Sequence, residues 1–236
     1  MQGVVPAAGA GTRLGDLGEN TQKGLVEVAG RPLLAYVFDR LLEVGVAELF
    51  VVIGHGGEDI IARFGDQYGD TPITYVHQRE PLGLAHAIAQ TEPHIDDAFI
   101  VLNGDNIFGT SINPAIDAVD EGAHGAILVE SVSGDEPPQT GVIETEGDRI
   151  THIVEKPREP SSQLVTTGCY VLPEAVFHAC ALVQPSETGE YELSEAVALL
   201  ARAGYDITPV RFDGWRVNVN TPEDIHVAER LLTASR

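Results

Sequence analysis

Short apolar runs alternate with amphipathic segments of helical length through the first half of this chain. The runs that have strand length are Val4–Ala7, Leu49–Ile53, Ile73–Val76 and Phe99–Leu102. The segments expected to form helices between them are Leu33–Val44, Asp59–Phe64 and Leu84–Gln90. The strand runs are continuously apolar, which is typical of strands buried on both faces of a parallel sheet. This order predicts an α/β fold, a three-layer α/β/α Rossmann-like sandwich with a mixed, mainly parallel sheet.

The second half of the chain has a different rhythm, with several strand-like segments in succession. These segments are Ala126–Val132, Gly141–Glu144, Ile150–Glu155 and Val165–Leu172. Gly147-Asp148 separates the second and third of them and predicts a hairpin, which makes the sheet mixed. A helix is expected over Tyr191–Ala203, and another begins at Thr221-Pro222, where threonine can cap the helix and proline suits its first position. No linker interrupts the chain, so we expect a single domain over residues 1–236.

The chain is strongly acidic, with 36 Asp and Glu residues against 14 Lys and Arg residues and a formal net charge of −22. Nucleic acid and anionic membranes are therefore excluded as expected partners, because both require a basic surface. Only two lysines occur, Lys23 and Lys156. Scarce lysine and dispersed carboxylates favour a halophilic protein, since molar salt shortens the Debye length to about 3 Å. An acidic protein adapted to ordinary salt is the alternative.

The remaining composition indicates a protein of the cytoplasm. Cys169 and Cys180 are the only cysteines, and their spacing matches no metal site and no disulfide framework. The first residues lack a basic segment followed by an apolar one, and no run approaches the roughly 20 apolar residues of a membrane span. We expect a cytoplasmic protein that can form a homo-oligomer.

A glycine-rich segment, Ala8-Gly9-Ala10-Gly11-Thr12, follows the first expected strand. Backbone amides in such a turn can face a phosphate, although the same glycines could serve only a tight strand exit. The segment is not a P-loop, and Leu14 replaces the third glycine of a dinucleotide fingerprint, which disfavours an NAD-dependent oxidoreductase. Arg13 and Lys23 add two cations to the same stretch and favour an anion site.

The glycine segment, continued by Arg13-Leu14 and Lys23, resembles the signature of the sugar-1-phosphate nucleotidylyltransferases. These enzymes are also called NDP-sugar pyrophosphorylases and include glucose-1-phosphate thymidylyl- and uridylyltransferases. Further segments resemble motifs of this family, in order and over essentially the whole chain: Gln78 with Pro81–Ala87, Leu102–Asn106, Thr140–Ile143, Glu155–Pro157, Thr167-Gly168 and Gly189–Glu192. The resemblance implies the nucleotide-diphospho-sugar transferase type of the α/β fold.

The resemblance also implies a role for individual residues. Nucleotide binding is expected from Ala8, Gly9, Gly11, Thr12, Gln78 and Gly83. The catalytic residues would be Arg13, Lys23 and Asp105, and those that bind the sugar phosphate would be Gly141, Glu155, Lys156 and Thr167. Mg²⁺ would be held by Asp105 and Asn218. Many members have aspartate in place of Asn218, and the N-acetylglucosamine-1-phosphate uridylyltransferases have asparagine, whose amide oxygen is a suitable hard ligand.

Several of these residues also have plainer explanations. Asp105 lies in Asn-Gly-Asp-Asn, which is good turn chemistry. Glu155 and Lys156 could form a surface ion pair, which contributes under about 1 kcal/mol. Trp215, the only tryptophan, could pack in the core or form a sugar platform.

The expected activity is transfer of a nucleotidyl group from UTP or dTTP to a sugar-1-phosphate, with glucose-1-phosphate the leading candidate. N-acetylglucosamine-1-phosphate, or mannose-1-phosphate with GTP, are alternative substrates, and a non-catalytic nucleotide-sugar-binding regulatory subunit is a different kind of alternative. About residues 1–110 would bind the nucleotide and about 111–236 the sugar. The attacking phosphate is already an anion, so the reaction needs no general base but does need positive charge, here from Arg13, Lys23, Lys156 and Mg²⁺.

Overall fold

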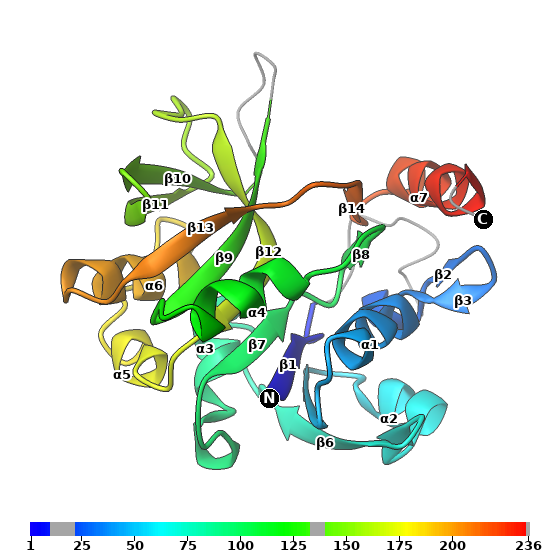
Figure 1. Cartoon of the computed structure of the whole chain (residues 1–236). Coiled ribbons are helices and arrows are strands. Elements are labelled where there is room, and N and C mark those ends of the chain that lie inside the picture. Colours follow the sequence, from blue (N-terminus) through cyan, green and yellow to red (C-terminus); the bar gives the residue numbers. More distant parts are fainter. Residues whose placement is uncertain (10–21, 133–139, 235–236) are drawn as a thin grey trace. The chain divides into compact units, whose positions relative to one another are not determined.

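The structure is a computed structural model that describes residues 1–9, 22–132 and 140–234 (Figure 1). The chain forms two compact units, and each consists of segments that are separated in the sequence. Unit 1 comprises Met1–Pro81, Leu102–Ser111 and Gly214–Arg236, and unit 2 comprises Leu82–Val101 and Ile112–Asp213. Within the described ranges, none of the helices is long and apolar enough to cross a membrane. The predicted nucleotide and sugar halves, about 1–110 and 111–236, stay a prediction about ligand binding.

The main sheet of unit 1 is largely parallel. Its strands are β1 (Gln2–Pro6), β4 (Glu48–Ile53), β6 (Thr71–His77) and the short edge strand β5 (Gln67–Tyr68). β4 pairs in parallel with both β1 and β6, and β5 pairs with β6 in the antiparallel sense. Val4, Val51 and Ile53 are fully buried, which explains why these strands have continuous apolar runs.

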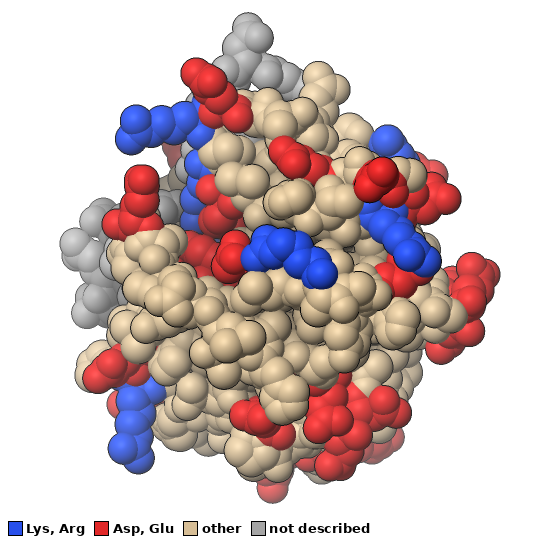
Figure 2. Space-filling view, turned by 90° about the vertical axis from the view of Figure 1, so that its left-hand side faces the viewer, with Lys and Arg blue, Asp and Glu red and all other residues tan. Residues whose placement is uncertain are grey.

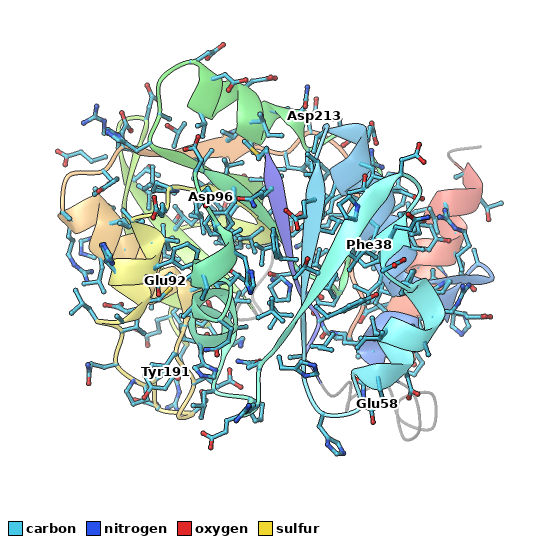
Figure 3. The ribbon with its side chains drawn as sticks, turned by 90° about the horizontal axis from the view of Figure 1, so that it is seen from below. Phe38, Glu58, Glu92, Asp96, Tyr191 and Asp213 are labelled. Carbon is cyan, nitrogen blue, oxygen red and sulfur yellow. The ribbon has the colours of Figure 1, made fainter. Side chains whose placement is uncertain are left out.

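Two helices connect the parallel strands of unit 1, α1 (Leu33–Glu43) and α2 (Glu58–Phe64). The buried residues of α1 recur every three or four positions, as expected for a helix with one face on the core. Phe38 of α1, labelled in Figure 3, packs edge-on against Phe64 and Tyr68, with ring centroids 5.0 and 5.2 Å apart. These aromatic contacts fasten α1 and α2 to the β5 edge of the sheet.

The rest of unit 1 surrounds a smaller apolar cluster. Its elements are the 3-10 turn η2 (Lys23–Leu25), β2 (Glu27–Val28), β3 (Arg31–Pro32), β8 (Asn106–Phe108), β14 (Arg216–Asn218) and α7 (Pro222–Ala234). Buried side chains from all of these segments except η2 and β3 meet in the cluster, among them Val28, Ile107 and Val217. At the start of α7, Thr221 N donates to Asp224 Oδ2 (2.8 Å) and Asp224 N donates to Thr221 Oγ1 (3.3 Å), so the predicted cap is reciprocal.

Unit 2 combines a mixed set of strands with four helices in its described part. The strands are β7 (Phe99–Leu102, whose last residue belongs to unit 1), β9 (Gly125–Ser131), β10 (Gly141–Glu146), β11 (Arg149–Glu155), β12 (Leu164–Leu172) and β13 (Ile207–Arg211). The helices are α3 (Leu84–Ala89), α4 (Asn113–Asp120), α5 (Val176–Cys180) and α6 (Leu193–Arg202), with a 3-10 turn, η3, over Glu92–His94. β12 pairs antiparallel with β9 and β10, whereas β13 pairs in parallel with β9. The predicted hairpin is confirmed: β10 and β11 pair antiparallel around Gly147, whose φ is 61°.

The α/β class and the mixed sheet agree with the prediction from the sequence. The acidic side chains are scattered over the face that Figure 2 shows rather than gathered in one patch. This dispersion matches the even spread of Asp and Glu along the sequence.

Candidate active site

A lysine, an aspartate and an asparagine from three distant segments meet in unit 1. Lys23 Nζ donates to Asp105 Oδ2 and to Asn220 Oδ1, both at 2.8 Å. The side chains of Lys23 and Asp105 are 14% and 27% exposed, so the ion pair is largely shielded from water. Hydrogen bonds of this charge-assisted kind are about twice as strong as neutral ones. The predicted catalytic residues Lys23 and Asp105 are thus in direct contact.

Backbone pairing brings Asp105 next to Asn218. In the β8–β14 ladder Asn106 lies opposite Asn218, and Val219 N donates to Asp105 O at 2.8 Å. On the other side of the turn, Gly104 N donates to Pro6 O at 3.1 Å. A Cβ at position 104 would lie 2.7 Å from this same oxygen, so the turn requires glycine there.

Both carboxylate oxygens of Asp105 accept hydrogen bonds. Oδ2 accepts from Lys23, and Oδ1 accepts from Asn106 Nδ2 at 2.8 Å. The Asn106 side chain is itself held, because Arg216 Nη1 donates to Asn106 Oδ1 at 2.6 Å. Asn106 is only 2% exposed, so this chain of contacts runs through the interior of unit 1.

The donor set around Asp105 fits a divalent cation such as Mg²⁺. Asn218 Oδ1 is buried and has no hydrogen-bond partner among the described residues, which is unusual for a buried acceptor and suits a metal ligand. Each oxygen of Asp105 keeps a lone pair beyond the bond it already accepts. Among the described residues no three His, Cys, Asp or Glu side chains gather in a metal-binding group. Mg²⁺ needs no such group, because it is commonly held by one or two carboxylates together with substrate phosphates and water.

The described residues of unit 1 that are predicted to bind the nucleotide follow two parallel strands of one sheet. Ala8 and Gly9 come two and three residues after the end of β1, Gln78 directly follows β6, and β4 lies between these two strands. The backbone N of Gln78 donates to Ile53 O at 2.9 Å, and Gln78 as a whole is only 5% exposed. Carboxyl ends of adjacent parallel strands are the usual ligand site of such sheets. The other predicted residues of this segment, Gly11, Thr12 and Arg13, lie outside the described residues.

Gly83, also predicted to contact the nucleotide, lies in unit 2 at the start of α3. Its φ is 100°, which favours glycine. The neighbouring backbone pairs with Tyr191 (labelled in Figure 3), whose N donates to Leu82 O at 2.7 Å and whose O accepts from Ala85 N at 2.9 Å. A Cβ on Gly83 would lie 2.7 Å from both the N and the O of Tyr191. Two motifs about 100 residues apart in the sequence are therefore joined here without room for a side chain.

The predicted sugar-phosphate residues Gly141, Glu155 and Lys156 lie together at one end of the β10–β11 hairpin. Gly141 is the ladder partner of Glu155, and a Cβ on it would lie 3.3 Å from Glu155 Oε2. Glycine at this position leaves room for the carboxylate. Lys156 Nζ lies 3.4 Å from Glu155 Oε1, and its side chain is 47% exposed. Lys156 has a φ of 42°, which is uncommon for lysine and turns the chain as β11 ends.

A further carboxylate, Glu192, belongs to the same group of charges. Burial raises the pKa of Glu192 above its ordinary value, and the carboxylate of Glu155 raises the pKa further, whereas Lys156 lowers it. Glu192 ends the motif Gly189–Glu192, but no individual role was predicted for it. The group offers acceptors for sugar hydroxyls next to one cation.

Thr167 occupies a more interior place than the other predicted sugar-phosphate residues. It is 1% exposed, and its hydroxyl donates to Leu128 O at 2.8 Å. It can therefore offer a ligand only its remaining acceptor capacity. The neighbouring Thr166 shares a hydrogen bond with Thr140, with 2.8 Å between the two Oγ1 atoms.

Three residues outside the predicted set take positions in the structure that favour packing. Trp215 packs against the apolar cluster of unit 1, and a Cβ on Gly109 would collide with its indole ring. Cys169 and Cys180 are buried, and burial raises the pKa of both thiols, that of Cys180 to about 12. Neither thiol is therefore a nucleophile at neutral pH.

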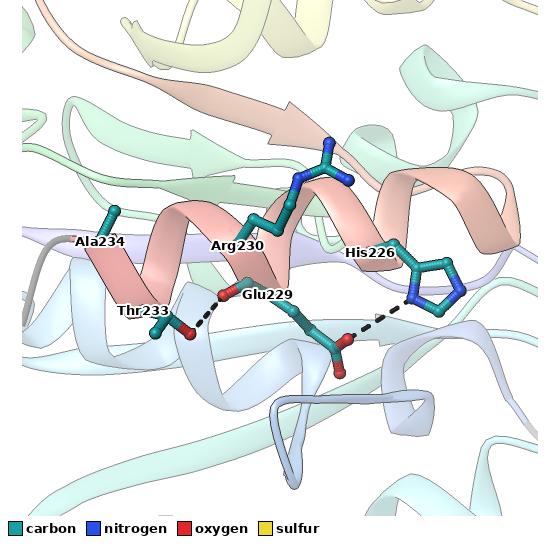
Figure 4. A pocket seen from close by; sticks show the side chains of 5 residues that line it. All are labelled: His226, Glu229, Arg230, Thr233 and Ala234. Atoms are coloured by element: carbon teal, nitrogen blue, oxygen red, sulfur yellow. Dashed lines mark hydrogen bonds and ion pairs between the residues drawn. The ribbon is translucent and has the colours of Figure 1, made fainter.

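A surface cleft of about 620 Å³ lies along α7 (Figure 4). Its lining residues are His226, Glu229, Arg230, Thr233 and Ala234. His226 Nδ1 lies 3.6 Å from Glu229 Oε2, and Glu229 Oε1 accepts from the backbone N of Ala29 at 3.1 Å. None of the described residues predicted to bind substrate lines this cleft, and we assign it no substrate.

Three partners of the predicted residues were missed from the sequence: Asn220, Asn106 and Arg216. Asn106 directly follows Asp105, and Asn220 follows Asn218 at a spacing of two, which places residues on one side of an extended chain. This spacing was the available signal. The pairing of β14 with β8, which brings Arg216 to Asn106, had no signal in the sequence.

Comparison with known proteins gives a family for the whole chain. The sequence model of the Nucleotidyl transferase family matches residues 2–234. UTP–glucose-1-phosphate uridylyltransferase AglF of Haloferax volcanii is 49% identical over 98% of this chain and 96% of that protein. Glucose-1-phosphate thymidylyltransferase of Streptomyces antibioticus is 31% identical over 98% of this chain, but the chain spans 66% of that protein. The chain spans 53% of the bifunctional protein GlmU of Methanococcus maripaludis strain C5, at 32% identity.

Solved structures agree with this result. A crystal structure assigned as a glucose-1-phosphate thymidylyltransferase from Bacillus anthracis, in complex with sucrose, superposes with a TM-score of 0.88 at 28% identity, over 98% of this chain and 94% of that chain. A UDP-glucose pyrophosphorylase complexed with UDP-glucose has a TM-score of 0.89 over 100% of this chain and 99% of that chain, and its 23% identity supports the fold alone. The predicted fold class and the predicted family are both confirmed. The chain belongs to the nucleotidyl transferase family.

Proposed function

We propose that this protein transfers the uridylyl group of UTP to glucose-1-phosphate and releases pyrophosphate, with dTTP as the alternative nucleotide. The observation that carries the proposal is the contact of Lys23 with Asp105 and Asn220, together with the buried oxygen of Asn218, which has no partner in the described part of the chain. This combination of a shielded cation and hard oxygen ligands suits a triphosphate with its metal ion. AglF of Haloferax volcanii, which is 49% identical over 98% of this chain and 96% of its own length, is named as a uridylyltransferase for glucose-1-phosphate.

The reaction requires that an oxygen of the sugar phosphate attack the α-phosphorus of the nucleotide while pyrophosphate leaves. The attacking group is an anion at neutral pH, so the main task of the protein is to hold two polyanions and neutralise their charge. Lys23, together with Arg13, would supply fixed positive charge to the triphosphate. Asp105 and Asn218 would hold Mg²⁺, which when bound stabilises the negative charge that develops on the phosphate oxygens.

The sugar phosphate would be bound by the charged group of unit 2. Glu155 and Glu192 present carboxylate oxygens that can accept hydrogen bonds from sugar hydroxyls, and Gly141 leaves space beside Glu155. Lys156 would bind the phosphate, because its side chain is about half exposed and its ammonium group can reach a ligand. Thr167 stays a predicted contact that would act as an acceptor.

N-acetylglucosamine-1-phosphate is the second candidate sugar, favoured by asparagine rather than aspartate at position 218. A non-catalytic regulatory subunit is disfavoured, because Lys23 and Asp105 are both retained and in contact. We also propose that the protein requires high KCl for activity and stability, because salt screens the repulsion among its acidic side chains at a net charge of −22. The cytoplasmic location and homo-oligomer formation stay predictions.

The proposal is tested by measuring pyrophosphate release in high KCl with Mg²⁺. UTP, dTTP, CTP, ATP and GTP are each combined with glucose-, N-acetylglucosamine-, galactose- and mannose-1-phosphate. We expect release with UTP or dTTP and glucose-1-phosphate, and a rate about 100- to 1000-fold lower for Lys23→Ala, the size of loss that follows removal of one group that stabilises transition-state charge.

Arg202→Gln is the matched control, because it removes a cation that pairs with Glu195 on the surface of α6. It should leave the rate unchanged. Absence of pyrophosphate release for every pair, from folded protein that still binds UDP-glucose, would refute catalysis and favour the regulatory subunit.

A further inference from the structure

We propose that Arg216 is a positioning residue that orients the carboxylate of Asp105 through the side chain of Asn106. The inference rests on the proposed function, because it concerns the residues that would hold the metal ion. It is based on two consecutive hydrogen bonds, from Arg216 Nη1 to Asn106 Oδ1 at 2.6 Å and from Asn106 Nδ2 to Asp105 Oδ1 at 2.8 Å.

The chemistry of the three groups allows only one direction for these bonds. A guanidinium can donate but cannot accept, so the amide of Asn106 must turn its oxygen toward Arg216. The NH₂ group of Asn106 then faces Asp105, whose ionised carboxylate can only accept. Arg216 thus removes the ambiguity of an asparagine side chain, whose two ends have nearly the same shape but opposite hydrogen-bonding character.

The register of the β8–β14 ladder places these side chains within reach. Arg216 lies opposite Phe108, and Asn218 lies opposite Asn106, so Arg216 and Asn106 are diagonal neighbours. Diagonal neighbours on one face are about 7–8 Å apart, a distance that a long side chain spans. The candidate metal ligand Asn218 and the arginine therefore come from the same three-residue strand.

The two oxygens of Asp105 are held by groups of different kinds. Oδ2 is held by Lys23, whose ammonium group would also be drawn to the phosphates of a bound nucleotide. Oδ1 is held by Asn106, which is 2% exposed and cannot follow a ligand. The Asn106 contact therefore keeps the carboxylate in one orientation whether or not Lys23 moves.

The test measures the dissociation constant of Mn²⁺ by electron paramagnetic resonance, with protein saturated with UDP-glucose and without pyrophosphate, so that no turnover occurs. The variants are Arg216→Met, Asn106→Leu and the double variant, with Arg202→Gln as the matched surface control. Loss of a residue that orients a metal ligand weakens metal affinity by about 10- to 100-fold. We expect a weakening of this size for Asn106→Leu, a smaller one for Arg216→Met, and none for Arg202→Gln.

The double variant decides whether the two residues act in series. If Arg216 works through Asn106, the double variant binds Mn²⁺ no more weakly than Asn106→Leu alone, whereas independent contributions would multiply. If the two substitutions weaken Mn²⁺ affinity by factors that multiply, the inference is overturned, because Arg216 and Asn106 then act independently. An Arg216→Met variant with unchanged Mn²⁺ affinity and a raised KM for UTP would also overturn it and would make Arg216 a substrate contact. Should Asn106→Leu not fold, as judged by thermal unfolding, Arg216→Lys must retain more affinity than Arg216→Met, because lysine can still donate to Asn106.

These results are separable from the test of the proposed function. Wild-type protein that produces UDP-glucose while all variants keep wild-type Mn²⁺ affinity refutes only the role of Arg216. Wild-type protein that releases no pyrophosphate for any substrate pair refutes the proposed function itself.

Discussion

Replacement of Gly83 by alanine should destabilise the protein for two separable reasons. The φ of Gly83 is 100° and its ψ is 179°, a region of backbone conformation essentially restricted to glycine, and an L-residue there costs about 1–3 kcal/mol. The added Cβ would also lie 2.7 Å from the backbone N and O of Tyr191 and 2.9 Å from Glu190 Cβ. Overpacking of this kind costs about 1–3 kcal/mol, and a backbone obstacle yields less than a side chain. The total is about 2–6 kcal/mol.

Gly65, at the end of α2, provides a matched control. Its φ is 69° and its ψ is −148°, in the same glycine-restricted region as Gly83, but a Cβ there would meet no described atom within 4 Å. Gly65→Ala should therefore cost only the conformational part, about 1–3 kcal/mol. In a protein of 236 residues, 1 kcal/mol lowers Tm by about 2–4 °C. With similar conformational costs, Gly83→Ala should melt about 2–12 °C below Gly65→Ala.

The assay is thermal unfolding followed by circular dichroism, with all three proteins in the same concentration of KCl. Equal melting temperatures for the two variants would refute the close approach of Gly83 to Tyr191. A smaller loss for Gly83→Ala than for Gly65→Ala would refute it more strongly, since both glycines lie in the same region of backbone conformation.

Three other predictions concern the α7 cap, the Glu192 carboxyl and the thiols. Thr221→Ala should lower the free energy of unfolding by about 1 kcal/mol, measured by urea denaturation, because Asp224 N loses its capping oxygen; an unchanged value would contradict the cap. The pKa of Glu192 is raised in the folded protein, so its ionisation destabilises the fold as pH rises above the ordinary value of 4.5. Glu192→Gln should therefore raise Tm at pH 7, with a gain that disappears as pH falls below 4.5, and a gain that grows on acidification would contradict the sign. Cys169 and Cys180 should react with a thiol reagent only after unfolding, because both are buried and their pKa values are raised; labelling of native protein at pH 8 would contradict this.

The helices and strands that could be predicted from the sequence are those with a regular pattern of apolar residues. The runs that became β1 and β4 are continuously apolar, and α1 carries apolar residues at helical spacing, so sequence alone located them to within one or two residues. β8 and β14 were missed, since strands of three residues are too short to show any period. Their pairing depends instead on packing with Ile107 and Val217 in the apolar cluster of unit 1.

The same division holds for the candidate site. Lys23 and Asp105 could be singled out because each lies in a recognisable local motif. Asn220, which accepts a hydrogen bond from Lys23, could not, because this contact joins residues 197 positions apart and exists only through tertiary structure. For Thr167 the sequence motif could be recognised, but the hydrogen bond from its hydroxyl to Leu128 O could not be predicted, because it depends on the pairing of β12 with β9.

The contacts of Lys23 with Asp105 and Asn220 also affect the order in which the two units can fold during synthesis. All segments of unit 2 have been made once residue 213 has left the ribosome, whereas unit 1 still lacks the segment that begins at Gly214. Since domains tend to fold as their chain emerges from the ribosome, unit 2 can fold before the chain of unit 1 is complete. Until Asn220 has been made, Lys23 lacks one of its two hydrogen-bond acceptors, and β8 lacks its partner strand β14. A nascent chain halted before residue 214 would therefore contain all the residues predicted to bind the sugar phosphate but would lack Asn218, one of the two predicted metal ligands.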